Sequence, residues 1–271
     1  MRLLRIEMRR ALHRRAVRVL IAIALFGCAM AGVISFVGSR GKSVAELRFD
    51  EGEHPAIMTE WWIADANEGF LIIAVFFLLM GGLIGGATVA GGEWRHGTVT
   101  TLLTWEPRRL RLHAARSASA AILSFVISFG LQILFLASFL PAVFAHGTTD
   151  GVDGSFWVGL VVAMARSSAV TAGAALLAVA LATLARNTAF AVIAVFAWMV
   201  VVENLVRGLK PSVTRWLWGE NLGTVMTWSQ LPDADFTRGP AVALLTLLAY
   251  SGVVVAAATV SFQRRDIAAA S

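Results

Sequence analysis

The sequence predicts an all-α integral membrane protein with six transmembrane helices. Three observations indicate this class: 58% of the 271 residues are hydrophobic, only 15% are charged, and the apolar residues are concentrated in long runs. A soluble domain carries about 25% charged residues. A disordered chain needs low hydrophobicity, and a disulfide-stapled secreted module needs several cysteines, whereas Cys28 is the only one. The composition therefore excludes all three of these classes.

Six stretches are long enough to cross the hydrocarbon core, which takes about 20 residues in a helix. They are Val17–Val37, Gly69–Ala90, Ser117–Ala145, Ser167–Ala185, Thr188–Val206 and Ala241–Phe262. We expect Pro141 to bend or end the third helix near its far end. Arg166 is expected at the membrane interface before the fourth helix, so that Phe156–Ala165 lies in, or re-enters, the outer boundary. The outer segment 207–240 is a second candidate for re-entry.

The distribution of positive charge predicts the orientation. With the N-terminus inside, the cytosolic segments carry 15 basic and 4 acidic residues, and the outer segments carry 8 basic and 13 acidic residues. Cytosolic loops of membrane proteins are enriched in Lys and Arg, so both termini are expected in the cytosol. Because the arginines cluster beside apolar runs, we expect them to contact membrane lipid rather than nucleic acid.

Residues 1–16 carry apolar positions on one helical face and arginines on most of the remainder. This pattern predicts a short amphipathic helix that lies in the cytosolic headgroup layer. A basic flank without a defined structure is the alternative.

Two patterns concern helix packing. Glycines form two overlapping small-xxx-small motifs in the second predicted span: Gly81, Gly82, Gly85 and Gly86. We interpret these motifs as close helix packing, with a hinge or a cavity-facing role as the alternative. Polar residues share one face of the third predicted helix: Ser117, Ser124, Ser128 and Gln132. Hydrogen bonds between helices explain this face more simply than a substrate path does.

The sequence shows no catalytic or metal-binding constellation. None of the five histidines lies at ligand spacing with a carboxylate. The segment Gly38–Ser43 is similar to a phosphate loop but lacks the first glycine of the motif. Glu203, near the outer end of the fifth predicted span, is almost the only ionisable residue inside a span. We therefore expect no metal, no cofactor and no enzymatic activity in this chain.

The loop between the second and third predicted spans, residues 91–116, carries the most informative pattern. It contains an acid and an arginine, a Gly-Thr pair, a Leu-Leu pair, a proline and several arginines: Glu93, Arg95, Gly97, Thr98, Leu102, Leu103, Pro107, Arg108, Arg109 and Arg111. We expect a short helix beneath the membrane that presents charge and small residues to a cytosolic partner. A solvated positive loop is the alternative.

This loop resembles that of the ABC type-2 (ABC-2) exporter permeases, which show an acid, Gly-Thr, Leu-Leu, a proline and an arginine between spans two and three. Six spans, the basic N-terminal segment and a fifth span that ends in Glu203 extend the resemblance over the whole chain. One departure is Trp105-Glu106 before the proline, where small or polar residues are expected. The end of the loop helix therefore stays open.

The resemblance implies one permease domain, residues 1–271, in the bacterial plasma (inner) membrane. Two separate ATP-binding cassette subunits would carry ATP and Mg²⁺, and the loop helix would dock in a cleft of the ATPase. The residues from Glu93 to Leu103 would couple to the ATPase, and Pro107 with the arginines after it would anchor the loop to phosphates. A second permease chain, identical or related, would complete the path for an amphipathic or hydrophobic drug, peptide or lipid, as in multidrug or antibiotic efflux.

Two other functions compete with this one. A membrane anchor or immunity protein would bind a partner without ATP-coupled transport. A membrane enzyme that acts on lipid is disfavoured, because no catalytic constellation is evident.

Overall fold

The computed structural model describes residues 2–49, 54–62, 70–95, 104, 108–229 and 238–264. These residues are almost entirely helical, and six helical segments are long and apolar enough to cross a membrane. They are α2 (Arg15–Gly38), α4 (Phe70–Arg95), α6 (Arg109–His146), α7 (Gly154–Ala185), the run of α8 (Thr188–Ala197) and α9 (Glu203–Leu209), and α11 (Pro240–Arg264). The predicted all-α class and the six membrane-capable helices are confirmed.

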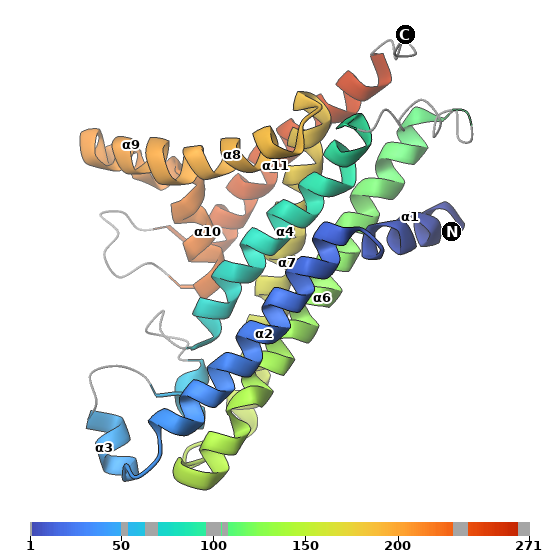
Figure 1. The fold of residues 1–271 in the computed structure, drawn as a ribbon. Coiled ribbons are helices and arrows are strands. Elements are labelled where there is room, and N and C mark those ends of the chain that lie inside the picture. The colour runs from blue at the N-terminus through green and yellow to red at the C-terminus, as the bar shows by residue number, and fades with distance from the viewer. Residues whose placement is uncertain are drawn as a thin grey trace.

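The central helix of the bundle is α7, which packs against α4, α6 and α11. Of its most apolar stretch, 56% is buried inside the protein, against 11% in both α2 and α11. Helix α2 lies along α6 and touches α4 over only a short stretch. In contrast, α8 and α9 run across the direction of the bundle (Figure 1). Consequently α2, α8 and α11 expose most of their apolar side chains.

Helix α7 extends beyond the predicted fourth span. It begins at Gly154 and not at Ser167, so Phe156–Ala165 is its first part, and the position of this part at the outer boundary stays a prediction. The backbone N–H of Phe156 donates to the Asp153 carboxylate at 2.9 Å, which fixes the start of the helix.

Arg166 lies within this continuous helix. Its predicted position at the membrane interface stays a prediction. In the structure its guanidinium lies 5.8 Å from the ring centre of Trp62 and 5.7 Å from that of Trp228. Two aromatic faces thus accommodate the cation within a continuous helix.

Helix α6 is the longest, with 38 residues. It begins in the basic loop, and it continues through Pro141 to His146. Of the two expected effects of this proline, the end of the helix is wrong, and a bend stays a prediction. At about 1.5 Å per residue α6 measures about 57 Å, which exceeds the hydrocarbon thickness of about 30 Å.

The N-terminal segment forms α1 (Arg2–Leu12), as its pattern predicted. Met8 and Ala11 pack against the main apolar core, whereas Ile6 is 52% exposed. The helical conformation is interrupted at His13 and Arg14, and α2 begins at Arg15. The helix itself is confirmed, and its position in a headgroup layer stays a prediction.

The remaining described elements are short. They are α3 (Val44–Phe49), the 3₁₀ turn Met58–Trp61, the π-helical turn Trp198–Val202 between α8 and α9, the 3₁₀ turn Pro211–Trp216, and α10 (Trp218–Thr227). The last two form a segment that returns from α9 towards the bundle, where α10 contacts α11 and α7. The short helix predicted within loop 91–116 falls largely outside the described residues.

The four glycines of α4 divide into two faces with different roles. At Gly82 an added Cβ would overlap Thr171, and at Gly86 it would overlap the backbone of Ala175. At Gly81 and Gly85 an added Cβ would meet nothing within 4 Å. Close packing against α7 is therefore confirmed for the first pair, and the second pair faces open space.

This division predicts opposite effects for two alanine variants one residue apart. Gly86→Ala should destabilise the protein by about 1–3 kcal/mol, because overpacking forces α4 away from α7. Gly85→Ala, its control, should be neutral or stabilising by up to about 1 kcal/mol, because alanine favours a helix. Thermal denaturation in detergent measures both. Equal melting temperatures would contradict the two-face assignment.

Candidate functional site

A buried carboxylate joins three elements at the end of the bundle where α1 lies. Glu93, in the last turn of α4, is only 3% exposed. It forms ion pairs with Arg10 of α1 at 3.3 Å, with Arg14 at 3.2 Å and with Arg116 of α6. Arg10 also pairs with Glu7 at 2.9 Å. We call these five residues the Glu93 cluster.

Because the Glu93 cluster is largely shielded from water, its charges depend on one another for stabilisation. Arg116 is 3% exposed, and a buried guanidinium is tolerated only with a counter-charge. Arg14 also donates to the backbone carbonyls of Thr88 and Val89, the latter at 3.1 Å, which ties the break between α1 and α2 to α4. Burial lowers the pKa of Arg14, and the Glu93 carboxylate opposes that shift. Removing the carboxylate would thus leave several cations unbalanced.

Aromatic contacts join further helix ends beside the Glu93 cluster. The guanidinium of Arg186, at the end of α7, lies 5.0 Å from the ring centre of Trp94 on α4. Trp94 meets Phe262 of α11 edge to face, with centroids 6.4 Å apart. The ring of His113 on α6 lies 5.6 Å from the same phenylalanine. The ends of α4, α6, α7 and α11 therefore converge next to the loop that connects α4 to α6.

The structure places the predicted loop residues in different settings. Glu93 is turned towards arginines of its own chain, and Arg95 ends α4. Arg108 precedes α6 and is exposed, Arg109 lies in the first turn of α6, and Arg111 is exposed. Outside the described residues lie Gly97, Thr98, Leu102, Leu103 and Pro107. Contacts of this loop with an ATPase or with phosphates stay predictions.

Sequence reasoning missed the partners of Glu93. One signal was present, because Arg116 lies at the start of an apolar run and needs a nearby acid. Glu93 is one of only two acids in the 91–116 loop. The contributions of Arg10 and Arg14 carried no such signal, because they depend on how α1 packs against α6 and so brings its arginines to the end of α4.

An apolar pocket of about 490 Å³ lies between α2, α4 and α6, within the range of about 300–1,000 Å³ typical of ligand sites. At its α1 end it is lined by Ala11, Val17 and Val89. The open face of α4 contributes Gly81 and Gly85. The Glu93 cluster therefore stands directly beside the α1 end of the pocket, because Arg14 binds the carbonyl of Val89.

A buried polar network between α6 and α7 borders this pocket. The Gln132 side-chain amide is fully buried and donates to the hydroxyl of Ser168 at 2.9 Å. Its carbonyl oxygen accepts from the hydroxyl of Ser167 at 2.8 Å. The N–H group of the Gln132 amide also donates to the backbone carbonyl of Ser128 at 3.2 Å. The expected hydrogen bonds between helices are confirmed for Gln132, whereas Ser124 lines the pocket.

A second buried carboxylate, Glu203, binds the first turn of α10. It is 2% exposed and accepts the backbone N–H of Gly219 at 2.9 Å and the indole N–H of Trp198 at 3.1 Å. The N-terminus of a helix carries partial positive charge, which stabilises a buried carboxylate there. The π-helical turn directly before Glu203 is of a kind found frequently at functional sites.

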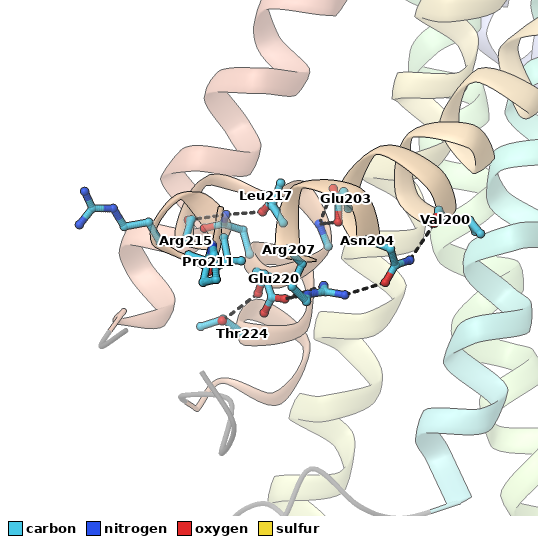
Figure 2. A network of polar contacts seen from close by, with 12 residues as sticks. Val200, Glu203, Asn204, Arg207, Pro211, Arg215, Leu217, Glu220 and Thr224 are labelled. Carbon is cyan, nitrogen blue, oxygen red and sulfur yellow. Dashed lines mark hydrogen bonds and ion pairs between the residues drawn. The ribbon is translucent and has the colours of Figure 1, made fainter. Parts of the chain in front are cut away.

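Further polar contacts fix the angle between α9 and α10. Arg207 forms an ion pair with Glu220 at 2.6 Å and donates to Asn204 at 3.0 Å (Figure 2). The Asn204 amide donates in turn to the carbonyl of Val200 at 2.8 Å. The segment after α9 is therefore folded back towards the bundle in a defined conformation, at least as far as Thr227. Its depth in a membrane, and hence any re-entry of residues 207–240, stays a prediction.

A comparison with known protein families matches no family model, and a comparison with curated proteins finds no match. Within the residues that the structure describes, no group of three or more His, Cys, Asp or Glu could hold a metal ion. The function must therefore be inferred from the geometry of the helices and from the loop pattern.

The Glu93 cluster predicts that Glu93→Gln releases α1. Removing one partner of a buried ion pair costs about 3–5 kcal/mol, because the arginines lose their counter-charge. Hydrogen exchange of the α1 amides should become faster in this variant. Glu220→Gln, which breaks the more exposed pair with Arg207, should cost only about 0–1 kcal/mol and leave α1 unchanged. Unchanged exchange in Glu93→Gln would show that the cluster does not hold α1.

The Glu203 contacts predict that Glu203→Ala unwinds the start of α10. The amide of Gly219 would lose its partner at a cost of about 1–3 kcal/mol. Hydrogen exchange over Trp218–Thr227 should rise, whereas Leu205→Ala, at an exposed apolar side chain two residues away, should change it little. A variant whose α10 stays as protected as in the wild type would refute this role.

Proposed function

We propose that the chain is the permease subunit of an ATP-driven exporter, and that the loop between α4 and α6 couples it to a separate ATPase. The observation that carries the proposal is the ion pair of Glu93 with Arg116, because these residues stand at the two ends of that loop. Because its two ends are joined in this way, a force applied to the loop would pass to α4 and α6 together.

The Glu93 cluster extends this joint to other helices. Arg10 and Arg14 bring in α1 and the start of α2. The contacts of Trp94 with Arg186 and Phe262 bring in α7 and α11. Rigid-body switching between inward-facing and outward-facing states needs helices that move as units. The convergence of six helix ends beside one loop supports such a movement.

The sequence pattern of the loop supports an ATPase as the source of the force. Gly97 and Thr98 are small residues, and Leu102 and Leu103 are apolar. The buried position of Glu93 gives it a positioning role in this proposal, and Thr98 becomes the principal contact. Pro107 and the arginines Arg108, Arg109 and Arg111 would anchor the loop to lipid phosphates.

The complex would contain two such permease chains and two ATPases that carry ATP and Mg²⁺. Apolar side chains exposed on α2 and α8, such as Phe26 (69%) and Ile193 (64%), suit lipid or a second permease chain. The complex would lie in the bacterial plasma membrane with both termini in the cytosol. An amphipathic or hydrophobic drug, peptide or lipid would be its exported substrate.

The test is capture of the ATPase from the native membrane in mild detergent. The tagged wild-type chain should elute with a stoichiometric ATP-binding subunit and with ATPase activity. Thr98→Trp should weaken this binding roughly 5- to 150-fold, because overpacking a contact costs about 1–3 kcal/mol. Thr149→Trp, the same change in an exposed outer loop, is the matched control and should retain the subunit.

Two outcomes would reject the proposal. If the wild-type chain elutes without an ATPase, a membrane anchor or immunity protein becomes the better interpretation. If Thr98→Trp inserts normally and retains the ATPase at the wild-type level, the loop is not the coupling element.

A further inference from the structure

We propose that the pocket between α2, α4 and α6 binds one acyl chain of an anionic phospholipid, whose headgroup lies among the arginines where α1 meets α2. The proposal does not depend on the exporter function. It concerns a lipid site within a single chain and would hold for a membrane anchor as well.

The shape of the pocket suits a hydrocarbon chain. On α4 its lining runs from Ile73 to Val89, about 24 Å at about 1.5 Å per residue. One leaflet of a bilayer contributes about 15 Å of hydrocarbon, half of the total thickness. Ile23, Ile73 and Phe77 belong to the lining and are 62%, 53% and 69% exposed. The pocket therefore opens sideways between α2 and α4, where a lipid tail can enter.

The lining offers little to a polar ligand. Thr171 is among its few hydroxyl residues, and that hydroxyl already donates to the carbonyl of Ser167 at 3.0 Å. The hydroxyl of Ser128 accepts from the Gln132 amide at 3.3 Å. Because an unpaired polar group is costly to bury, the pocket selects an apolar occupant.

The glycines of α4 create this space. Gly82 and Gly86 lock α4 against α7, so the back wall of the pocket is fixed. Gly81 and Gly85 have no neighbour within 4 Å and leave the front of the helix flat. A larger side chain on this front face would fill the pocket without disturbing the packing against α7.

Charge selects the headgroup. Residues 1–18 contain seven arginines and a single glutamate. Within the Glu93 cluster, three arginines face two carboxylates, which leaves one positive charge in excess. Arg15 and Arg18 are exposed on the first turn of α2, and Arg5 and Arg9 are exposed on α1. Arginines near a membrane surface attract anionic lipids, and a zwitterionic headgroup gains no comparable attraction.

The test is native mass spectrometry of the full chain released from vesicles with equal amounts of phosphatidylglycerol and phosphatidylcholine. The wild-type chain should retain one phosphatidylglycerol in clear excess over phosphatidylcholine. Neutralising the two exposed arginines in Arg15→Gln/Arg18→Gln should reduce this preference about fivefold for each charge removed. Both residues lie outside the Glu93 cluster, so α1 should stay in place.

A pair of glycine variants locates the lipid. Gly85→Leu places a side chain in the pocket and should abolish the retained lipid. Gly252→Leu is the matched control, because Gly252 on α11 also has no neighbour within 4 Å and is exposed outside the pocket. If Gly85→Leu fails to fold, Gly81→Leu makes the same test one turn away.

Three results would overturn the proposal. Equal retention of the two lipids would remove the charge selection. Retention by Gly85→Leu or Gly81→Leu at the wild-type level would place the lipid outside the pocket. A wild-type chain that retains no lipid, or a different hydrophobic compound, would reject an acyl chain as the occupant. None of these results bears on capture of the ATPase, so the two proposals can fail separately.

Discussion

The attraction between one buried carboxylate and three arginines sets the arrangement of one end of this protein. Glu93 is 3% exposed, as is Arg116, so neither can exchange its partner for water at low cost. The partners come from α1, from the break before α2 and from α6. This charge therefore acts together with the apolar packing of α1 on α6 to hold α1, the two ends of the loop between α4 and α6, and the α1 end of the apolar pocket in place.

Helix α4 connects that end to the centre of the bundle because its two glycine faces have different neighbours. The absence of side chains at Gly82 and Gly86 lets α7 approach closely, which fixes the central pair of helices. The same absence at Gly81 and Gly85 leaves a space that α2 does not fill, because α2 follows α6 instead. Tight packing and an open pocket therefore arise from one motif. The two glycine pairs differ only in the face of α4 on which they lie.

Much of the fold follows from local signals in the sequence. The six apolar runs, the amphipathic α1 and the close packing at the α4 glycines need only periodicity and residue size. The start of α7 could not be predicted, because the charge of Arg166 is accommodated by Trp62 and Trp228, which are distant in the chain. The candidate site was predicted only as a loop pattern. Its ion pairs join residues up to 83 positions apart, and such pairings depend on the packed bundle.

The unequal lengths of the helices determine how each of them would fit a bilayer. Helix α6, at about 57 Å, extends beyond a hydrocarbon core of about 30 Å whatever its tilt within the usual range. Helix α11 has 25 residues, about 38 Å, and comes much closer to that thickness. A helix that is longer than the hydrocarbon core must tilt, bend or project into the interface, each at a cost of fractions of a kcal/mol per Å. Helix α6 would therefore project beyond the core in a bilayer of any usual thickness, whereas α11 would fit with a modest tilt.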